Sequence, residues 1–186
     1  YDVIDNWYGI DSQSFIKELQ NIKSSTINLR INSPGGDVFD ARAIQTALKQ
    51  HKAKVVAHID GLAASAATYI ALGADEVRMS EGAFFMIHKG WTLALGNADE
   101  FRKTADLLDK VDESIANDYA AKTGIEHAEL IAMMAAETWF TATEAKEKGF
   151  VDAIFTGEKL ENTFDLQVYD NAPKEKTPEE PPKAVF

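Results

Sequence analysis

The sequence contains no cysteine and only five prolines, and both scarcities limit what the chain can do. Without cysteine there are no disulfides, no thiolate metal sites and no cysteine nucleophile. Four of the five prolines lie within residues 171–186, where they alternate with charged residues. Such a composition buries too little apolar surface to fold. We therefore expect one domain over residues 1–170, followed by a disordered tail.

Positive charge is also scarce, because 19 Lys and Arg face 30 Asp and Glu, for a net charge of −11. This balance argues against a nucleic-acid-binding surface, which requires a basic patch. No apolar run approaches the ~20 residues of a membrane span, and no signal-peptide pattern leads the chain. These absences predict a cytoplasmic protein with no membrane partner. Because the chain starts at Tyr1 rather than Met, we expect a trimmed native N-terminus.

Histidine is the remaining residue type that could hold a transition metal, and its spacing does not favour this. The four histidines show no metal-ligand pattern, so we predict neither a metal nor another cofactor. They are His51, His58, His88 and His127.

The apolar residues that are present alternate between strand and helix patterns, which predicts an α/β fold with largely parallel pairing. The expected strands are residues 26–31, 54–59, 75–79, 83–87 and 150–154. One expected helix starts near Ser12. The others cover residues 41–48, 66–72, 98–122, 126–135 and 143–148. Residues 1–10 are too apolar for a free tail and are expected to form an edge strand or an arm.

The longest predicted helix, residues 98–122, is capped by Asn97 and ended by Gly124. It is longer than a helix needs to be in order to cover one face of a small sheet. Two interpretations remain open: the helix projects and packs against another subunit, or it lies on its own domain. Apolar residues follow one side of it, namely Phe101, Leu108, Val111, Ile115 and Tyr119.

Ser65 lies at a sharp junction between the strand of residues 54–59 and the helix that starts at Ala66. A helix N-terminus offers free N–H groups, and the oxyanion of an acyl-transfer intermediate needs such donors. The arrangement resembles a nucleophile elbow, although the Gly-x-Ser-x-Gly pattern is absent. The alternative is that Ser65 is only a small residue packed among alanines.

Two further segments could complete such a site. Gly36 frees the backbone of the turn at residues 32–37, so its N–H and that of Asp37 can bind an anion. His88 follows a predicted strand and is well placed for a base, although a lone histidine can also be structural. The rival base, His58, is interpreted as a core or interface residue. With a later carboxylate, these features would fill the roles that acyl transfer by serine requires.

Three segments of this sequence resemble the signature segments of the Clp protease proteolytic subunit, ClpP. They are Ile31-Asn32-Ser33-Pro34-Gly35-Gly36, Gly61-x-Ala63-Ala64-Ser65 and Met86-Ile87-His88. The resemblance covers residues 26–155 and continues through Phe140-Thr141-Ala142-x-Glu144-Ala145 and Gly149-Phe150-Val151-Asp152. The particular residues in these segments are most similar to those of the ClpP-like proteases of phages and prophages. Those proteases are often associated with capsid maturation.

The resemblance implies a Ser/His/acid endopeptidase of the crotonase-like fold, assembled as rings that enclose the active sites. It implies Ser65 as the nucleophile, His88 as the base, and Gly36, Asp37 and Ala66 as backbone donors to the oxyanion. The long helix matches the handle through which rings stack. The implied partners are protein or peptide substrates, further copies of the chain, and either phage capsid proteins or a Clp ATPase.

The acid of the family is an aspartate, and counting back from Gly149 places Glu137 in its position. Asp152 and Glu81 are the alternatives, each interpreted as a solvated or structural carboxylate. The sequence also departs from the family at Lys89-Gly90 and in its short N-terminal segment. Three other functions stay open: a housekeeping subunit that works with an ATP-driven unfoldase, a crotonase-like acyl-CoA enzyme, and an inactive scaffold subunit.

Overall fold

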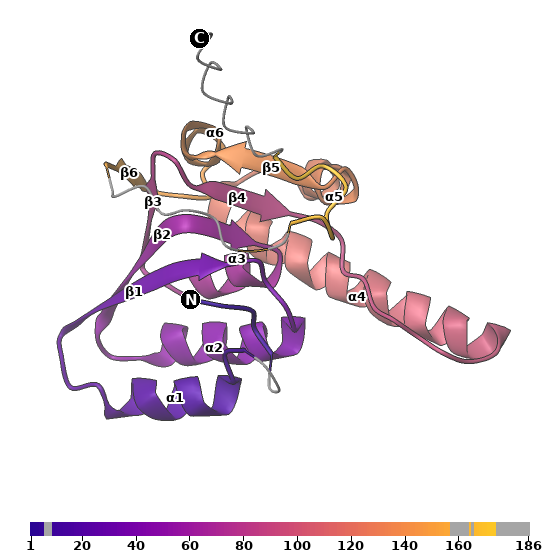
Figure 1. Ribbon diagram of the computed structural model, residues 1–186, viewed down its shortest axis with the longest axis horizontal. Helices are drawn as coiled ribbons and strands as arrows, with labels where there is room; N and C mark the ends of the chain where they lie inside the picture. Colours follow the sequence, from indigo (N-terminus) through magenta and orange to yellow (C-terminus); the bar gives the residue numbers. More distant parts are fainter. Residues whose placement is uncertain (6–8, 157–163, 165, 174–186) are drawn as a thin grey trace, which may run out of the picture.

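The computed structural model describes residues 1–5, 9–156, 164 and 166–173 (Figure 1). Most of the expected tail, residues 174–186, and the apolar pair Trp7-Tyr8 lie outside this range.

Helices and strands alternate along the described chain much as predicted. The strands are β1 (Thr26–Ser33), β2 (Lys54–Ala64), β3 (Glu76–Ser80), β4 (Phe84–Ile87), β5 (Thr138–Thr141) and β6 (Ala153–Phe155). The helices are α1 (Ser12–Asn21), α2 (Val38–Gln50), α3 (Ala66–Ala71), α4 (Ala98–Thr123), α5 (His127–Ala135) and α6 (Ala142–Glu147). The expected α/β class is confirmed. The sequence analysis missed β5, which is too short for its alternation to stand out.

β2 is the centre of the sheet, and its two halves have different partners. Residues 54–59 pair in parallel with β1 on one side, and Val56–Ile59 pair with β3 on the other. Leu62–Ala64 then pair with β4, which continues the sheet to the antiparallel β5. The register with β1 shifts between Ile31 and Ser33. The second half of β2 therefore carries the chain toward the ends of β1 and β4, where the glycine turn and His88 follow.

The helices cover the sheet in separate groups (Figure 1). α1 and α2 lie together on one side, and α3 packs between α2 and the sheet. α5 and α6 lie near β5 at the opposite end, where α5 also packs on α4. The core between these layers contains Tyr69, Phe85 and Phe150, each at most 2% exposed.

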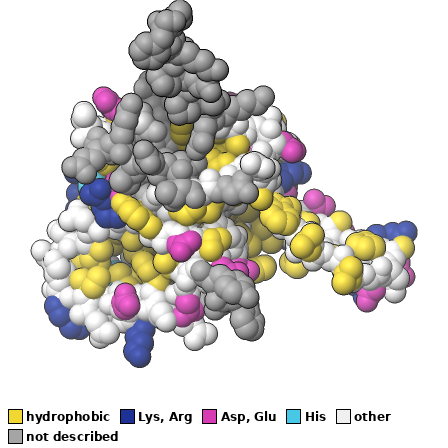
Figure 2. Space-filling view, in the orientation of Figure 1, with side chains coloured by type: hydrophobic (Ala, Val, Ile, Leu, Met, Phe, Trp, Pro, Cys, Tyr) yellow, Lys and Arg dark blue, Asp and Glu magenta, His cyan; other side chains and the backbone are white. Residues whose placement is uncertain are grey.

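α4 has two different halves, so its apolar residues do not form one continuous docking surface. Ile115 and Tyr119 are 4% and 1% exposed and belong to the core of the chain's own domain. The N-terminal half extends away from the body (Figure 1), and there Phe101 and Leu107 are 50% and 52% exposed. Figure 2 shows hydrophobic side chains gathered along this arm. The C-terminal half therefore lies on its own domain, whereas the N-terminal half projects and leaves its apolar residues exposed.

The N-terminal residues form an arm that closes over the glycine turn. Ile4 is 1% exposed and makes an isolated bridge with Gly36. Its N–H donates to the Gly35 oxygen at 2.7 Å, and its oxygen accepts from the Asp37 N–H at 2.8 Å. The arm thus fixes the backbone of the turn that lies beside Ser65.

Candidate active site

Ser65 occupies a strained position between β2 and α3. Its φ of 53° and ψ of −126° lie outside the regions that ordinary residues adopt. The strain is held in place on both sides, because the Ser65 N–H donates to the Met86 oxygen and the Thr68 hydroxyl donates to the Ser65 oxygen. Strain of this kind concentrates at functional sites and is typical of a nucleophile elbow.

The glycine turn touches this elbow directly. A Cβ on Gly35, whose φ is +101°, would lie 2.7 Å from the Ser65 Cβ and 3.0 Å from the Ala66 nitrogen. A Cβ on Gly36 would lie 2.1 Å from the Ile4 oxygen. Only glycine fits in both places, so the two residues allow the turn to approach the serine.

His88 meets Ser65 from the end of β4, as the sequence predicted. Its Nε2 lies 2.7 Å from the Ser65 Oγ. The parallel pairing of Leu62–Ala64 with Phe84–Met86 sets this distance, because it aligns the ends of the two strands. The chain after His88 is also fixed, since the Lys89 N–H donates to the Met134 oxygen of α5.

The charge state of His88 suits a base. Burial lowers the pKa of His88 below its usual value of 6.5, and the negative charges of Glu137 and Asp112 offset part of this effect. The imidazole is therefore neutral at neutral pH. In that state Nε2 can accept the proton of the Ser65 hydroxyl.

The three expected oxyanion donors are not equivalent. The Asp37 N–H already donates to the Ile4 oxygen, and the Asp37 side chain caps α2 through Phe39 and Asp40. The expectation for Asp37 therefore fails in this structure, because the N-terminal arm takes its N–H. Within the part of the chain that is described, no hydrogen bond occupies the N–H of Gly36 or of Ala66.

Glu137 lies near His88, but the structure does not join the two by a hydrogen bond. Its carboxylate accepts from the Trp139 indole at 3.0 Å and from the backbone N–H groups of Asp170 and Asn171 at 3.0 and 2.6 Å. None of the described residues accepts a hydrogen bond from the Nδ1 of His88. Glu137 reaches the imidazole only through its charge.

The rival residues all have other positions. The Nε2 of His58 lies 3.1 Å from the Asn28 side-chain oxygen, and its ring packs on Phe155. The carboxylate of Asp152 accepts from the Val77 N–H and the Lys122 ammonium group. Glu81 is exposed in the turn after β3. The placements of Asp152 and Glu81 agree with the structural and solvated interpretations given to them, whereas His58 is half-buried on the sheet rather than in the core.

A cavity of about 620 Å³ opens in front of the Ser65–His88 pair. The glycine turn forms one wall. Apolar side chains from α4 form another, including Leu108, Val111 and Ile115. The cavity therefore combines apolar walls with the polar groups of Ser65 and His88.

Comparison with known proteins agrees with this geometry. The family model described as Clp protease matches residues 11–158. The chain belongs to the Clp protease family. The ATP-dependent Clp protease proteolytic subunit 1 of Corynebacterium jeikeium is 31% identical over 135 residues, which cover 72% of each protein.

A second relative is the ATP-dependent Clp protease proteolytic subunit of Bacteroides fragilis, 28% identical over 130 residues. The match covers 69% of this chain but 63% of that relative, so the chain spans less than two thirds of its length. Among solved structures, the ClpP1 N165D mutant from Listeria monocytogenes has a TM-score of 0.75 at 24% identity. That match covers 85% of this chain and 90% of the mutant. At this identity the likeness establishes the fold.

No group of three or more histidine or acidic side chains in the described ranges could hold a metal ion. None of the helices that the structure describes is both long and apolar enough to cross a bilayer.

The sequence analysis did not consider Asp112 on α4, which lies near the site. Its side chain is buried and accepts from the Gly90 N–H at 2.7 Å, while the Lys89 ammonium group lies 3.8 Å away. Asp112 thus holds the chain just after His88 and places a negative charge near the imidazole. It shares the apolar side of the helix with Leu108 and Ile115, and a lone acid on such a face was the available signal.

Replacing Asp112 with asparagine should move the acid limb of the pH profile of this Clp protease family member. The amide oxygen can still accept from Gly90, but the charge that favours protonated His88 is gone. The pKa of His88 should fall further, so kcat/KM should persist to a lower pH, by about one unit or less. Glu137, Tyr169 and Lys89, the other ionisable groups near the imidazole, stay unchanged.

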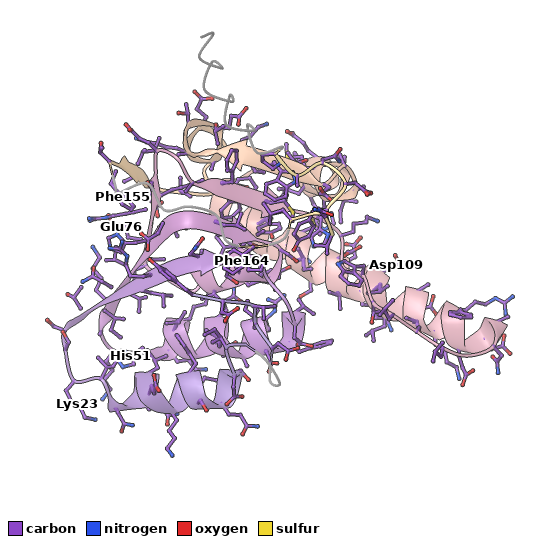
Figure 3. All side chains as sticks on the ribbon, in the orientation of Figure 1. Lys23, His51, Glu76, Asp109, Phe155 and Phe164 are labelled. Carbon is purple, nitrogen blue, oxygen red and sulfur yellow. The ribbon has the colours of Figure 1, made fainter. Side chains whose placement is uncertain are left out.

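The measurement is kcat/KM for a fluorogenic peptide between pH 4.5 and 8. Asp109, labelled on α4 in Figure 3, is exposed and provides the matched control, Asp109→Asn. An acid limb that is identical in Asp112→Asn and in the wild type would contradict this role for Asp112.

Proposed function

We propose that this chain is a serine endopeptidase that hydrolyses peptide bonds through an acyl-enzyme. The observation that carries the proposal is the 2.7 Å contact between the His88 Nε2 and the hydroxyl of a conformationally strained Ser65. Membership of the Clp protease family supports the same reaction. The catalytic residues are Ser65 as nucleophile and His88 as base.

In the first half-reaction, the Ser65 Oγ attacks the carbonyl carbon of the scissile bond and its proton passes to the His88 Nε2. The carbonyl oxygen becomes an oxyanion, which the N–H groups of Gly36 and Ala66 can stabilise. His88 then gives the proton to the leaving amine as the C–N bond breaks. In the second half-reaction, a water molecule gives its proton to His88 and attacks the acyl-enzyme in the same way. The carboxylic acid product leaves and the Ser65 hydroxyl is restored.

Glu137 completes the proposed triad. An acid that accepts from Nδ1 keeps the imidazole in the tautomer whose Nε2 is free to take a proton. The charge of Glu137 already raises the pKa of His88, and glutamate serves in this role in α/β-hydrolases. Full engagement requires its carboxylate to turn from Trp139 and residues 170–171 toward the imidazole.

The two other classes of function lack such support. An acyl-CoA enzyme of the same fold needs an oxyanion hole, but it has no use for a serine paired with a histidine. A scaffold subunit needs neither the strained φ of Ser65 nor the close approach of Gly35.

A fluorophosphonate probe separates these classes in one experiment. The probe phosphonylates an activated serine and leaves other hydroxyls unmodified. We expect one adduct, which peptide mass mapping assigns to Ser65. A chain that takes up no probe, or takes it up elsewhere, would refute the proposal.

We also propose that the working form is a ring assembled from copies of this chain and stacked through the arm of α4. The exposed Phe101 and Leu107 on the projecting half support this, because burying apolar surface stabilises an interface by ~25 cal/mol per Å². The proposed substrates are proteins in phage or prophage capsid processing. A housekeeping subunit served by a Clp ATPase is the alternative, and the names of the curated relatives fit it.

The two halves of α4 should respond differently to a charge. Leu107→Lys should give folded but smaller species in sedimentation velocity, because Leu107 is half exposed in the single chain. Ile115→Lys should unfold the subunit, because this side chain is 4% exposed and a buried unpaired ammonium group is very costly. Lys103, exposed on the same arm, provides the control Lys103→Gln. If Leu107→Lys sediments as the wild type does, the arm is not the interface.

A further inference from the structure

A segment far along the chain lies across the catalytic pair. Residues 166–173 follow β6 in sequence, yet Val168 and Tyr169 line the same cavity as Ser65 and His88. The Tyr169 hydroxyl donates to the Pro34 oxygen at 2.5 Å, at the start of the glycine turn. The ring of Tyr169 lies edge-on to His88, with centroids 5.4 Å apart.

Tyr169 also lies beside the nucleophile. Burial raises the pKa of Tyr169 to about 12, and the neighbouring Ser65 hydroxyl offsets part of this rise. The phenol is therefore protonated at neutral pH, and its proton is given to the Pro34 oxygen. The Ser65 hydroxyl keeps the His88 Nε2 as its hydrogen-bond partner.

The residues after Tyr169 are held as a bound peptide would be. The backbone N–H groups of Asp170 and Asn171 both donate to the Glu137 carboxylate. The Asn171 amide donates to the Ala136 oxygen at 3.0 Å. The Glu137 carboxylate thus accepts from backbone N–H groups, which any peptide offers, and the Ala136 oxygen accepts from one side-chain amide.

A small hydrophobic cluster on the sheet anchors the same segment. Leu62, Ala64 and Met86 form a small buried cluster, on which Phe164, Leu166 and Tyr169 pack. Phe164 is labelled in Figure 3, where it lies over the sheet. Trp139 adds a second aromatic wall, with its ring centroid 5.8 Å from that of Tyr169.

From these contacts we infer that the Ser65–His88 pair adjoins a peptide-binding site, which takes an aromatic residue between Trp139 and His88 and which the chain fills with its own Phe164 and residues 166–173. This rests on the proposed function and deepens it. The bound segment covers Ser65 and engages Glu137, so it competes with any peptide substrate. Its departure uncovers the hydroxyl and frees the carboxylate that the triad requires.

The test is the rate at which a fluorophosphonate probe labels Ser65 in the full-length chain. Tyr169→Ala removes the contacts with Pro34, Ser65, His88 and Trp139. Labelling should accelerate on the order of tenfold, which corresponds to about 1.4 kcal/mol. Tyr169→Phe keeps the aromatic packing but loses the hydroxyl, and should give a smaller increase. Ile22→Ala is the matched control, because Ile22 is 37% exposed at the end of α1 and does not line the cavity.

A synthetic peptide with the sequence of residues 164–173 provides a second measurement. Added to Tyr169→Ala, it should slow labelling in a saturable way, whereas the same peptide with alanine at position 169 should not. The inference fails if Tyr169→Ala labels at or below the wild-type rate, or if the two peptides act alike. No labelling of Ser65 in any of these proteins would instead refute the proposed function.

Discussion

Ser65→Ala should abolish peptide hydrolysis while the fold and the assembly stay intact. Alanine removes only the Oγ, and the Ser65 side chain makes no contact that α3 needs for its start. Loss of the nucleophile of a Ser/His/acid enzyme lowers kcat on the order of 10⁶-fold. Turnover of a fluorogenic peptide measures the effect, and circular dichroism with sedimentation confirms the fold and the assembly.

The companion variant is His88→Ala, which should lose nearly as much activity. Members of a triad act as a unit, so the double variant should be little worse than either single one. His58→Ala is the matched control, because His58 contacts Asn28 and Phe155 away from the nucleophile. Activity in Ser65→Ala above that of the double variant would disprove the assignment.

Glu137→Gln should produce the second-largest loss, on the order of 10³- to 10⁴-fold in kcat. The amide cannot stabilise the imidazolium and can leave Nδ1 in the wrong tautomer. Glu137 also binds the N–H groups of Asp170 and Asn171, so the substitution loosens residues 166–173 as well. That loosening alone would raise activity, and the two effects therefore have opposite signs.

Combining Glu137→Gln with Tyr169→Ala separates them. In that background the competing segment is already weakened, so the remaining loss reports how Glu137 orients His88. Glu147, exposed on α6, provides the control Glu147→Gln. If the double variant equals Tyr169→Ala in kcat, Glu137 serves only as an anchor and the site works as a Ser/His dyad.

The fold was predictable because most elements carry a local signal. Local signals place the start of a strand at Lys54, a helix start at Ser12, a helix cap at Asn97 and a helix end at Gly124, and the structure has all four there. β5 was missed because residues 138–141 become a strand only through antiparallel pairing with β4. No local pattern encodes a partner more than fifty residues away.

The site divides in the same way. The sequence could indicate that Ser65 and His88 lie together because each lies beside a recognisable strand end, and the structure brings them within 2.7 Å. Asp37 was wrongly included, because its N–H is taken by Ile4, a residue of the distant N-terminal arm. Tyr169 was missed for the same reason: its contacts with Pro34 and His88 span most of the chain and leave no trace in its neighbours.

α4 is attached at its root to both halves of the reactive pair. Through Tyr119 it meets the Thr68 hydroxyl, which in turn holds the Ser65 oxygen. Through Asp112 it holds Gly90, two residues after His88. The 14 residues of α4 before Asp112 extend ~21 Å from this attachment at 1.5 Å per residue. We expect a tilt of the free end to change the distance between the serine and the histidine. In the proposed ring, dilution that separates the arms should therefore lower activity before the subunit unfolds.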